Sequence, residues 1–307
     1  MPTPDVTLLS EPQWRAAEAA HRERVSVYSE PYRARRSSQQ AHPVHDFLFT
    51  YYSLAPGQLE RWHPGAGVVL LGRAAVDQRQ GWKHYQVIQD ADGAGTPGVC
   101  VDLEAFARDR DSMIAFASAI LVGTASRPGN FSCFGLHEWA MAYRSDLHGV
   151  RHEYLPLRLG GAGTDAVVEQ HQIRCTHFDA FRFYAPEAAP LNQLQPTRQT
   201  QRKLEQPGCL HANMDLYKWG YKLLPAVSSE LVTDAFELSW RVRTMDMQAS
   251  PYDLSEWGYS PIRIEDPQGK AEYVAAQRGF AEEAAALRAR LLQALRESAL
   301  LPAPDAA

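Results

Sequence analysis

The feature that most constrains the fold is a long run near the C-terminal end in which apolar residues recur every three or four positions. Over 272–300, one helical face carries Phe280, Ala284, Leu287, Leu291 and Leu295. Such a stripe on an α-helix is normally covered by another element. Weaker runs of the same kind predict helices over 11–37, with a break near Pro31, and over 102–122, 134–144, 210–224 and 228–248.

Predicted strands are few and short. The apolar run "GVVLLGR" at 67–73 is one, and we place the others within 67–89, 98–102 and 150–184. Composition predicts a loop over 90–98, a turn at the glycine-rich "LGGAGTD" of 159–165 and a long loop over 186–208. The predicted fold class is therefore mainly α, a single helical domain with a few short inserted β-strands.

Three segments can be distinguished within this helical fold. They are an N-terminal helical segment (1–40), a main catalytic domain (41–265) and a C-terminal helix with its tail (266–307). The last helix is expected either to lie at the periphery or to pack on a partner, which leaves a homodimer open.

Charge and composition limit the classes of partner. The 307 residues carry a formal net charge of −5, which gives no general attraction to nucleic acid or to an anionic membrane. The longest apolar run, 113–123, is too short to cross a bilayer, and the N-terminal residues lack a basic region followed by an apolar one. The four cysteines form no C-x-x-C pair, as expected for free thiols in a reducing compartment. We therefore expect a cytoplasmic protein with no membrane partner.

The segment "RCTHFDAFRFY" at 174–184 places two titratable residues in what reads as a buried strand. Alternate residues of a strand point the same way, so His177 and Asp179 would share a side. Together with His211 they would supply the two histidines and one carboxylate that bind non-haem iron or zinc. The alternative is a structural His–Asp hydrogen bond. His211 also shares a predicted helical face with Asp215 and Lys218, for which a solvated face is the alternative.

Further candidates lie in three other segments. His42 and His45 are three positions apart at the start of a predicted helix, so they could bind one metal ion together. The alternative is that His42 caps the helix and His45 packs against aromatic rings. His137 is a further possible ligand, and its neighbour Glu138 is the candidate general base, although a half-buried hydrogen-bonded pair explains them equally well. Arg198, in the long loop, could clamp an anionic group of a substrate.

Four stretches resemble a family of bacterial proteins of about this length that carry the label "3-methyladenine DNA glycosylase". They are "HPVHDFLFTYYSLAPGQLERWHPG", "FGLHEWAM", "THFDAFRFY" and "EQPGCLHANMDLYKW", and the resemblance covers about residues 40–260. It implies a DNA-repair hydrolase that flips an alkylated base out of duplex DNA into an aromatic pocket and cleaves its N-glycosidic bond.

The residues themselves favour a different function. Burying many ionisable groups costs several kcal/mol unless they are paired or bound to metal, so a polar pocket in an aromatic shell is expected. We predict an enzyme with a divalent metal, iron or zinc, that acts on a small polar or aromatic substrate. A DNA glycosylase and a non-catalytic ligand-binding protein are the alternatives.

Overall fold

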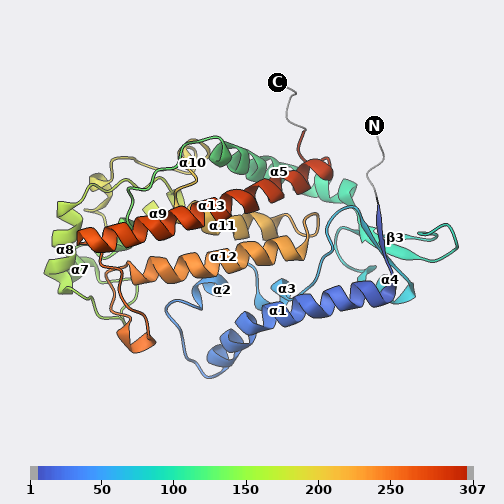
Figure 1. Ribbon diagram of the computed structural model, residues 1–307, viewed down its shortest axis with the longest axis horizontal. Helices are drawn as coiled ribbons and strands as arrows, with labels where there is room; N and C mark the ends of the chain where they lie inside the picture. The colour runs from blue at the N-terminus through green and yellow to red at the C-terminus, as the bar shows by residue number, and fades with distance from the viewer. Residues whose placement is uncertain (1–5, 303–307) are drawn as a thin grey trace.

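The computed structural model describes residues 6–302, and this part of the chain is mainly helical (Figure 1). Its longer helices are α1 (Glu11–Ser37), α4 (Arg73–Arg79), α5 (Leu103–Ala125), α6 (Leu136–Met141), α8 (Gly160–Gln170), α11 (Leu210–Lys222), α12 (Ser229–Gln248) and α13 (Pro267–Glu297). The short ones are α2 (Phe47–Tyr51), α3 (Pro56–Leu59), α7 (Ser145–His148), α9 (Phe178–Phe181), α10 (Gln201–Leu204), η1 (Ala189–Leu191) and η2 (Ser255–Trp257). The predicted fold class is confirmed.

One small sheet completes the fold at the end of the molecule where both ends of the described chain lie (Figure 1). It contains β1 (Thr7–Leu9), β2 (Val68–Leu71), β3 (Tyr85–Ile88) and β4 (Gly98–Val101), in the order β1-β2-β4-β3. β1 runs parallel to β2, whereas β4 pairs antiparallel with both β2 and β3. The strands predicted within 67–89 and 98–102 are therefore confirmed.

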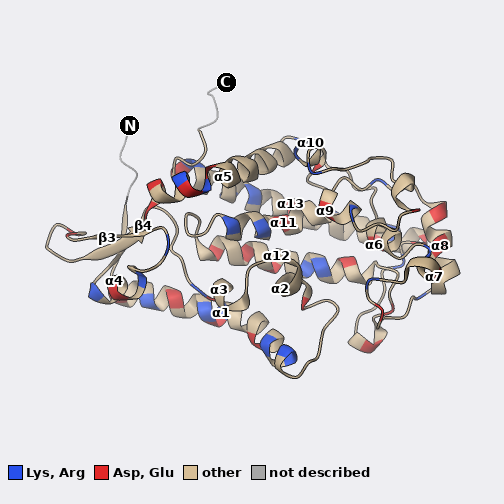
Figure 2. Ribbon diagram, turned by 180° about the vertical axis from the view of Figure 1, so that it is seen from behind, with Lys and Arg blue, Asp and Glu red and all other residues tan. Residues whose placement is uncertain are grey.

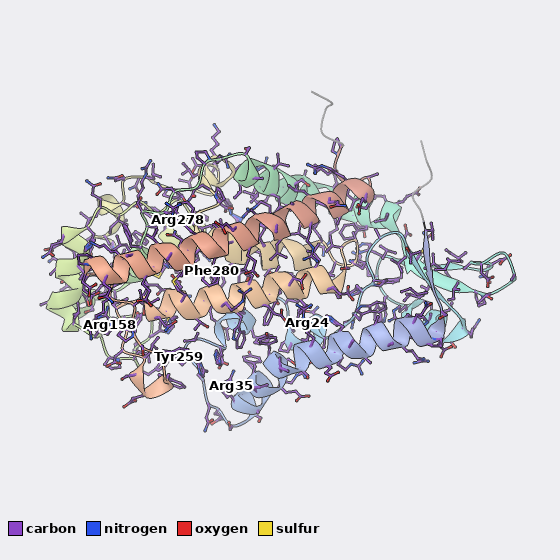
Figure 3. All side chains as sticks on the ribbon, in the orientation of Figure 1. Arg24, Arg35, Arg158, Tyr259, Arg278 and Phe280 are labelled. Carbon is purple, nitrogen blue, oxygen red and sulfur yellow. The ribbon has the colours of Figure 1, made fainter. Side chains whose placement is uncertain are left out.

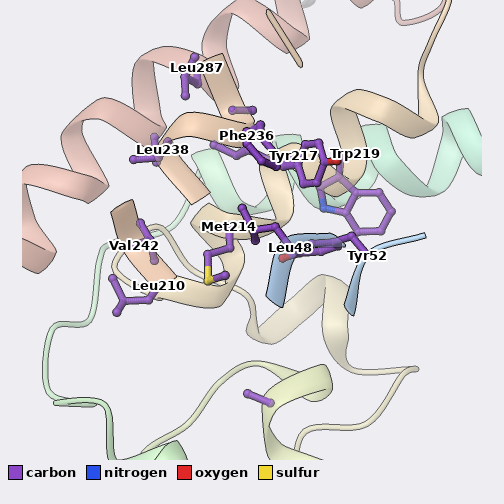
Figure 4. Packing of buried hydrophobic residues seen from close by; sticks show 14 of the residues in the cluster. Leu48, Tyr52, Leu210, Met214, Tyr217, Trp219, Phe236, Leu238, Val242 and Leu287 are labelled. Atoms are coloured by element: carbon purple, nitrogen blue, oxygen red, sulfur yellow. The ribbon is translucent and has the colours of Figure 1, made fainter. Parts of the chain in front are cut away.

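The main core lies between α11, α12 and α13. Leu210, Met214 and Tyr217 of α11 face Phe236, Leu238 and Val242 of α12, and Leu287 of α13 covers them (Figure 4). All of these side chains are buried. Helix α13 thus packs against α11, α12 and α5 of the same chain, so its apolar stripe is covered within the monomer and is not peripheral. The division of the chain into three segments stays a prediction.

A second core lies beneath the sheet and is built around a buried cation. The Arg79 guanidinium is fully buried, pairs with Glu18 at 2.8 Å, and lies 5.0 to 5.7 Å from the ring centres of Trp14, Trp62 and Trp82. A cation beside aromatic faces is attracted by their electron-rich rings. Trp62 also donates a hydrogen bond to Glu230 of α12, which ties the sheet to the helices.

The helix predicted over 11–37 forms, but the expected break at Pro31 does not. Helix α1 continues through Pro31 to Ser37. A proline leaves the carbonyl four residues earlier without its helical donor. That residue, Val27, is 63 % exposed, so water can reach its carbonyl, while Ser29 and Tyr32 on the opposite side stay buried. Farther back along α1, Arg24 reaches α12 and binds Asp234 and Glu237 (Figure 3).

The turn predicted at 159–165 is wrong, because α8 begins at Gly160. Helical spacing brings Thr164, Val167 and Val168 to the buried side, and the Thr164 hydroxyl donates to the Gly160 carbonyl. Burial of the two valines outweighs the low helical propensity of the glycines. The long loop over 186–208 is largely confirmed, although it contains the short helices η1 and α10.

The strand predicted over 174–184 is wrong as well. The Asn192 side chain binds both the N–H and the carbonyl of Cys175, as a neighbouring strand would, and only an isolated bridge joins Ile173 to Asn192. After Cys175 the chain turns into α9, and His177 Nδ1 accepts a hydrogen bond from Ala180 N–H at the helix start. His177 is therefore a helix cap, and it does not lie on a strand face with Asp179.

Across residues 6–302, every helix is too short or too polar to cross a membrane.

Replacing a leucine on the buried side of α13 tests whether this helix belongs to the main core. Leu291 is fully buried. We expect Leu291→Ala to lower the free energy of unfolding by about 2–5 kcal/mol, through lost burial and the cavity left behind. The exposed Glu282 of the same helix provides the control, and Glu282→Ala should change it by less than about 0.5 kcal/mol in urea unfolding. If Leu291→Ala changed the free energy of unfolding as little as Glu282→Ala does, the packing of α13 would not contribute to the stability of the main core.

Candidate metal centre and adjoining cleft

Helix α11 carries the central candidate residues. His211, Asp215 and Lys218 lie one helical turn apart and face the same side, as the sequence predicts. The solvated face considered as the alternative is wrong, because His211 is 8 % and Asp215 2 % exposed. α12 packs along α11, and the polar side of α11 meets His137 of α6 and Asp179 of α9.

A sharp turn before α6 brings His137 and Glu138 to this region. Gly135 has a positive φ of 69°, which favours glycine, and an added Cβ would approach Tyr273 to 3.3 Å. The helix is short and every one of its residues is buried. Helix α6 therefore places His137 and Glu138 in the interior of the protein.

The first buried group consists of His137, His211 and Asp246, from α6, α11 and α12. Each offers one ligand atom within 4.8 Å of the other two. His137 Nε2 lies 3.1 Å from the Asp246 carboxylate, and the His137 and His211 ring centres are 4.5 Å apart. Two histidines and one carboxylate on rigid helices are the ligand set that the sequence predicts, although only His211 was assigned to it as a primary ligand.

Two residues of this first group have polar atoms that form no hydrogen bond. Asp246 Oδ1 is buried without a hydrogen bond, although His137 Nε2 lies 3.1 Å from it, and the His211 ring makes no hydrogen bond to another described residue. Burial, followed by the nearby His137 and His177, lowers the pKa of His211 well below its usual value, so its ring is neutral. A neutral imidazole and a carboxylate oxygen are both able to bind a cation.

Arg243 compensates the buried carboxylates around this group. Its guanidinium donates to Glu138 Oε1 at 2.7 Å and lies 3.5 Å from Asp246. Burial alone would raise the pKa of Glu138, but the charges of Arg243 and His137 lower it to about 2. A carboxylate with so low a pKa is a weak base, so Glu138 is better suited to hold Arg243 than to act as the predicted general base.

The second buried group consists of His177, Glu205 and Asp215, whose ligand atoms also lie within 4.8 Å of one another. His177 Nε2 is 3.3 Å from Asp215 Oδ2 and 3.5 Å from Glu205 Oε1. Tyr52 donates to Asp215 Oδ1 at 3.1 Å, and Gln201 donates to Glu205 Oε1 at 2.5 Å. The two groups are neighbours, since the ring centres of His177 and His211 are 5.4 Å apart.

The second group resembles a hydrogen-bonded network, although Glu205 Oε2 is also buried without a hydrogen-bond partner within residues 6–302. Because His177 Nδ1 accepts the Ala180 N–H, the ring hydrogen sits on Nε2 and points at the carboxylates. The Lys218 ammonium already binds Asp215 and also lies 3.3 Å from Asp179. Burial opposes the charge on Lys218, yet Asp215 and Asp179 raise its pKa, so it stays a cation. Lysine thus supplies the positive charge that a metal would bring.

The other predicted site residues lie outside both groups. Asp179 binds Lys218 and Arg182, at 3.3 and 3.1 Å, so it touches the second group only through Lys218. The His42 and His45 rings stack 4.0 Å apart; His42 Nδ1 accepts backbone N–H groups, and His45 Nε2 bonds to a tyrosine hydroxyl. This arrangement matches the capping and packing alternative for the pair.

A cleft of about 850 Å³ adjoins the second group. Lys218 and Gln201 line it and connect it to Asp215 and Glu205. Aromatic rings form much of its wall, contributed by Phe47, Tyr51, Phe116, Tyr154, Phe183 and Trp219. Arg198 also lines this cleft, and its role in binding a substrate stays a prediction.

A much smaller cavity lies beside the first group, on the side of His137 and His211. Its volume is about 10 Å³, and Cys133, Cys175 and Cys209 complete its wall. A polar cavity of this size has room for about one water molecule. The Cys133 sulfur lies 4.0 Å from His137 Nδ1 and so orients the imidazole ring.

Sequence reasoning missed the carboxylates that complete both groups. Asp246 could have been found from the sequence. Together with Arg243 it forms an opposite-charge pair three positions apart that interrupts the apolar residues of "WRVRTMDMQ", which indicates a buried ion pair. Glu205 carries no such signal, because it lies in a polar, proline-rich stretch whose path depends on the rest of the fold.

Comparison of the chain with family models, with curated proteins and with solved structures finds no match.

The buried ion pair of Glu138 and Arg243 predicts a specific pH dependence. The pKa of Glu138 is about 2 in the folded protein and 4.5 without the fold, so the pair stabilises above about pH 4.5 and this contribution is lost as pH falls towards 2. We expect Glu138→Gln to cost about 3–5 kcal/mol in the free energy of unfolding at neutral pH.

That difference between wild type and Glu138→Gln should shrink as pH falls from about 4.5 towards 2 in denaturant titrations. The exposed Glu153, which forms no ion pair within residues 6–302, provides the control Glu153→Gln. A Glu138→Gln difference that stays constant with pH would contradict the assignment of this pair.

Proposed function

We propose that the protein is a metal-dependent enzyme in which His137, His211 and Asp246 hold one divalent cation, iron or zinc. The observation that carries this proposal is the buried cluster itself: the His211 ring makes no hydrogen bond to another described residue, and the only close polar contact of Asp246 Oδ1 among the described residues is His137 Nε2, a second potential ligand. Asp246 and Glu138 carry two negative charges, and Arg243 supplies one positive charge to both. Although burial opposes it, the Asp246 carboxylate 3.1 Å away raises the pKa of His137 well above its usual value, so a proton on His137 supplies the second positive charge. Metal uptake would displace that proton.

The chemistry that the cation would supply is Lewis acidity and, for iron, redox reactivity. The protein's own groups have distinct tasks around it. Arg243 and Glu138 fix the Asp246 carboxylate, and Cys133 orients the His137 ring. Loss of a contact that orients a metal ligand typically lowers metal affinity or activity about 10–100-fold. The small cavity limits the space next to His137 and His211 to about one water.

The substrate would bind in the aromatic cleft, which lies on the side of the second group. Its volume of about 850 Å³ is within the range of small-molecule sites. There the hydrogen on His177 Nε2 points at Asp215 and Glu205, and Lys218 presents a fixed positive charge to the cleft. These groups can hold or move a proton and bind an anionic part of the substrate.

A DNA-base glycosylase is the second candidate, and the aromatic walls of the cleft favour it, because a flipped base is held by stacking. It predicts metal-independent cleavage of alkylated duplex DNA, with binding that weakens steeply as salt rises. A ligand-binding protein without turnover would use the same cleft. Cleavage of alkylated duplex DNA in the presence of a chelator would separate the glycosylase from both other candidates, and metal analysis separates the metal enzyme from the ligand-binding protein.

Metal analysis tests the first proposal directly. We expect the purified, untagged protein to contain about one iron or zinc ion per chain by elemental mass spectrometry. Asp246→Asn keeps the size of the side chain and should lose most of this metal, as should His211→Ala. The matched control is His45→Ala, because His45 belongs to neither buried group.

Absence of metal from the wild type, even after reconstitution with iron or zinc, would eliminate the metal enzyme. Metal that persists in Asp246→Asn and His211→Ala but is lost on replacing His177 would place the cation in the second group instead. Thermal unfolding of every variant shows whether a loss of metal reflects a loss of fold.

A further inference from the structure

The aromatic cleft continues into a second, smaller cleft of about 370 Å³. Ser53, Tyr221 and Lys222 line both, so they mark the junction between the two. Arg198 lies on the side of the larger cleft and Arg110 on the side of the smaller one. The junction therefore belongs to one continuous surface.

Positive charge exceeds negative charge along this surface. Arg61, Arg110, Arg151, Arg182, Arg198, Lys218 and Lys222 line the two clefts, whereas the carboxylates that line them are Asp46 and Asp179. Asp46 is paired with Arg35, and Asp179 with Arg182 and Lys218. Elsewhere basic and acidic residues are interspersed, as along α1 (Figure 2). The imbalance is thus local, in a chain whose net charge is −5.

Three of these cations lie at the junction or in the cleft on either side of it, without a carboxylate partner. Arg110, Arg198 and Lys222 form no ion pair within residues 6–302. Lys222 is half-buried, and its pKa is lowered first by burial and then by the charges of Lys218, Arg110 and Arg198. Like charges held together in this way repel one another, and a bound anion would relieve that repulsion.

Hydrogen-bond donors and a flat wall complete the junction. The Ser53 and Tyr221 hydroxyls lie 3.1 Å apart and line both clefts. Trp219, next in the wall, packs beside Phe116 with ring centres 5.7 Å apart. Such a surface can take an anionic group at the cations and an aromatic ring beside it.

We propose that the junction of the two clefts binds the phosphate group of a phosphorylated aromatic substrate, held by Arg110, Arg198 and Lys222 together with the Ser53 and Tyr221 hydroxyls. A carboxylate ligand would bring only one negative charge to these three unpaired positive charges. A phosphate monoester brings a charge of about −1.5 to −2 and three acceptor oxygens, and so balances them better. Describing the bound molecule as a substrate rests on the proposed enzymatic function. The anion site itself is independent of the metal.

Calorimetric titration of the full-length protein tests the site with phenylphosphonate, an aromatic dianion that hydrolysis does not consume. We expect it to bind at least about tenfold more tightly than benzoate, which has one negative charge, and than inorganic phosphate, which has no ring. Raising the salt concentration should weaken this binding.

Variants at the junction assign the binding to these residues. Arg110→Gln, Arg198→Gln and Lys222→Met should each weaken phenylphosphonate about tenfold or more. The matched control is Arg108→Gln, on the same helix as Arg110 and lining neither cleft. The Asp246→Asn variant should bind phenylphosphonate like the wild type, which separates this site from the metal.

Three results would overturn the proposal: no binding of phenylphosphonate, binding no tighter than that of benzoate, or binding unaffected by the three junction variants. Loss of phenylphosphonate binding in Asp246→Asn, with the fold intact by thermal unfolding, would place the anion on the metal and overturn it as well. A protein that contains no metal yet binds phenylphosphonate at the junction would remove the metal enzyme and leave the anion site standing.

Discussion

The fold depends on the burial of α11 on nearly every side, although this helix carries several polar groups. Each buried polar group needs a partner, and each partner comes from a different element. Arg288 of α13 donates to Asn213, Ser239 of α12 donates to the Met214 carbonyl, and Tyr52 after α2 donates to Asp215. The surrounding elements are thereby held in fixed positions around α11, which is also what brings His137, His177 and Asp246 within reach of His211.

The regular helices were predictable because one periodic pattern determines them. Over 102–122, 228–248 and 272–300 the apolar stripe is long enough that propensity and burial agree, and α5, α12 and α13 form there. The predictions failed where a distant contact decides the local structure. Asn192 replaces a strand neighbour at Cys175, and buried valines draw a glycine-rich stretch into α8.

The candidate site was predictable as a set of residue types, but its pairing was not. The shared face of His211 and Asp215 follows from helical spacing alone. The partner of His211 is instead Asp246, 35 positions away (246 − 211) on the antiparallel neighbour α12, and only packing fixes that choice. Asp179 is predicted as a ligand on the basis of a strand, but the stretch forms α9 and Asp179 pairs with Lys218.

The buried Arg79 gives the sheet end of the molecule its own optical signature. Trp14, Trp62 and Trp82 are fixed around one guanidinium, so their near-ultraviolet circular dichroism depends on tertiary packing at that end. The far-ultraviolet signal, in contrast, comes mostly from helices such as α11, α12 and α13. If the sheet end loosened on its own, the first signal would fade while the second persisted, so two spectra of one sample can distinguish partial from complete unfolding.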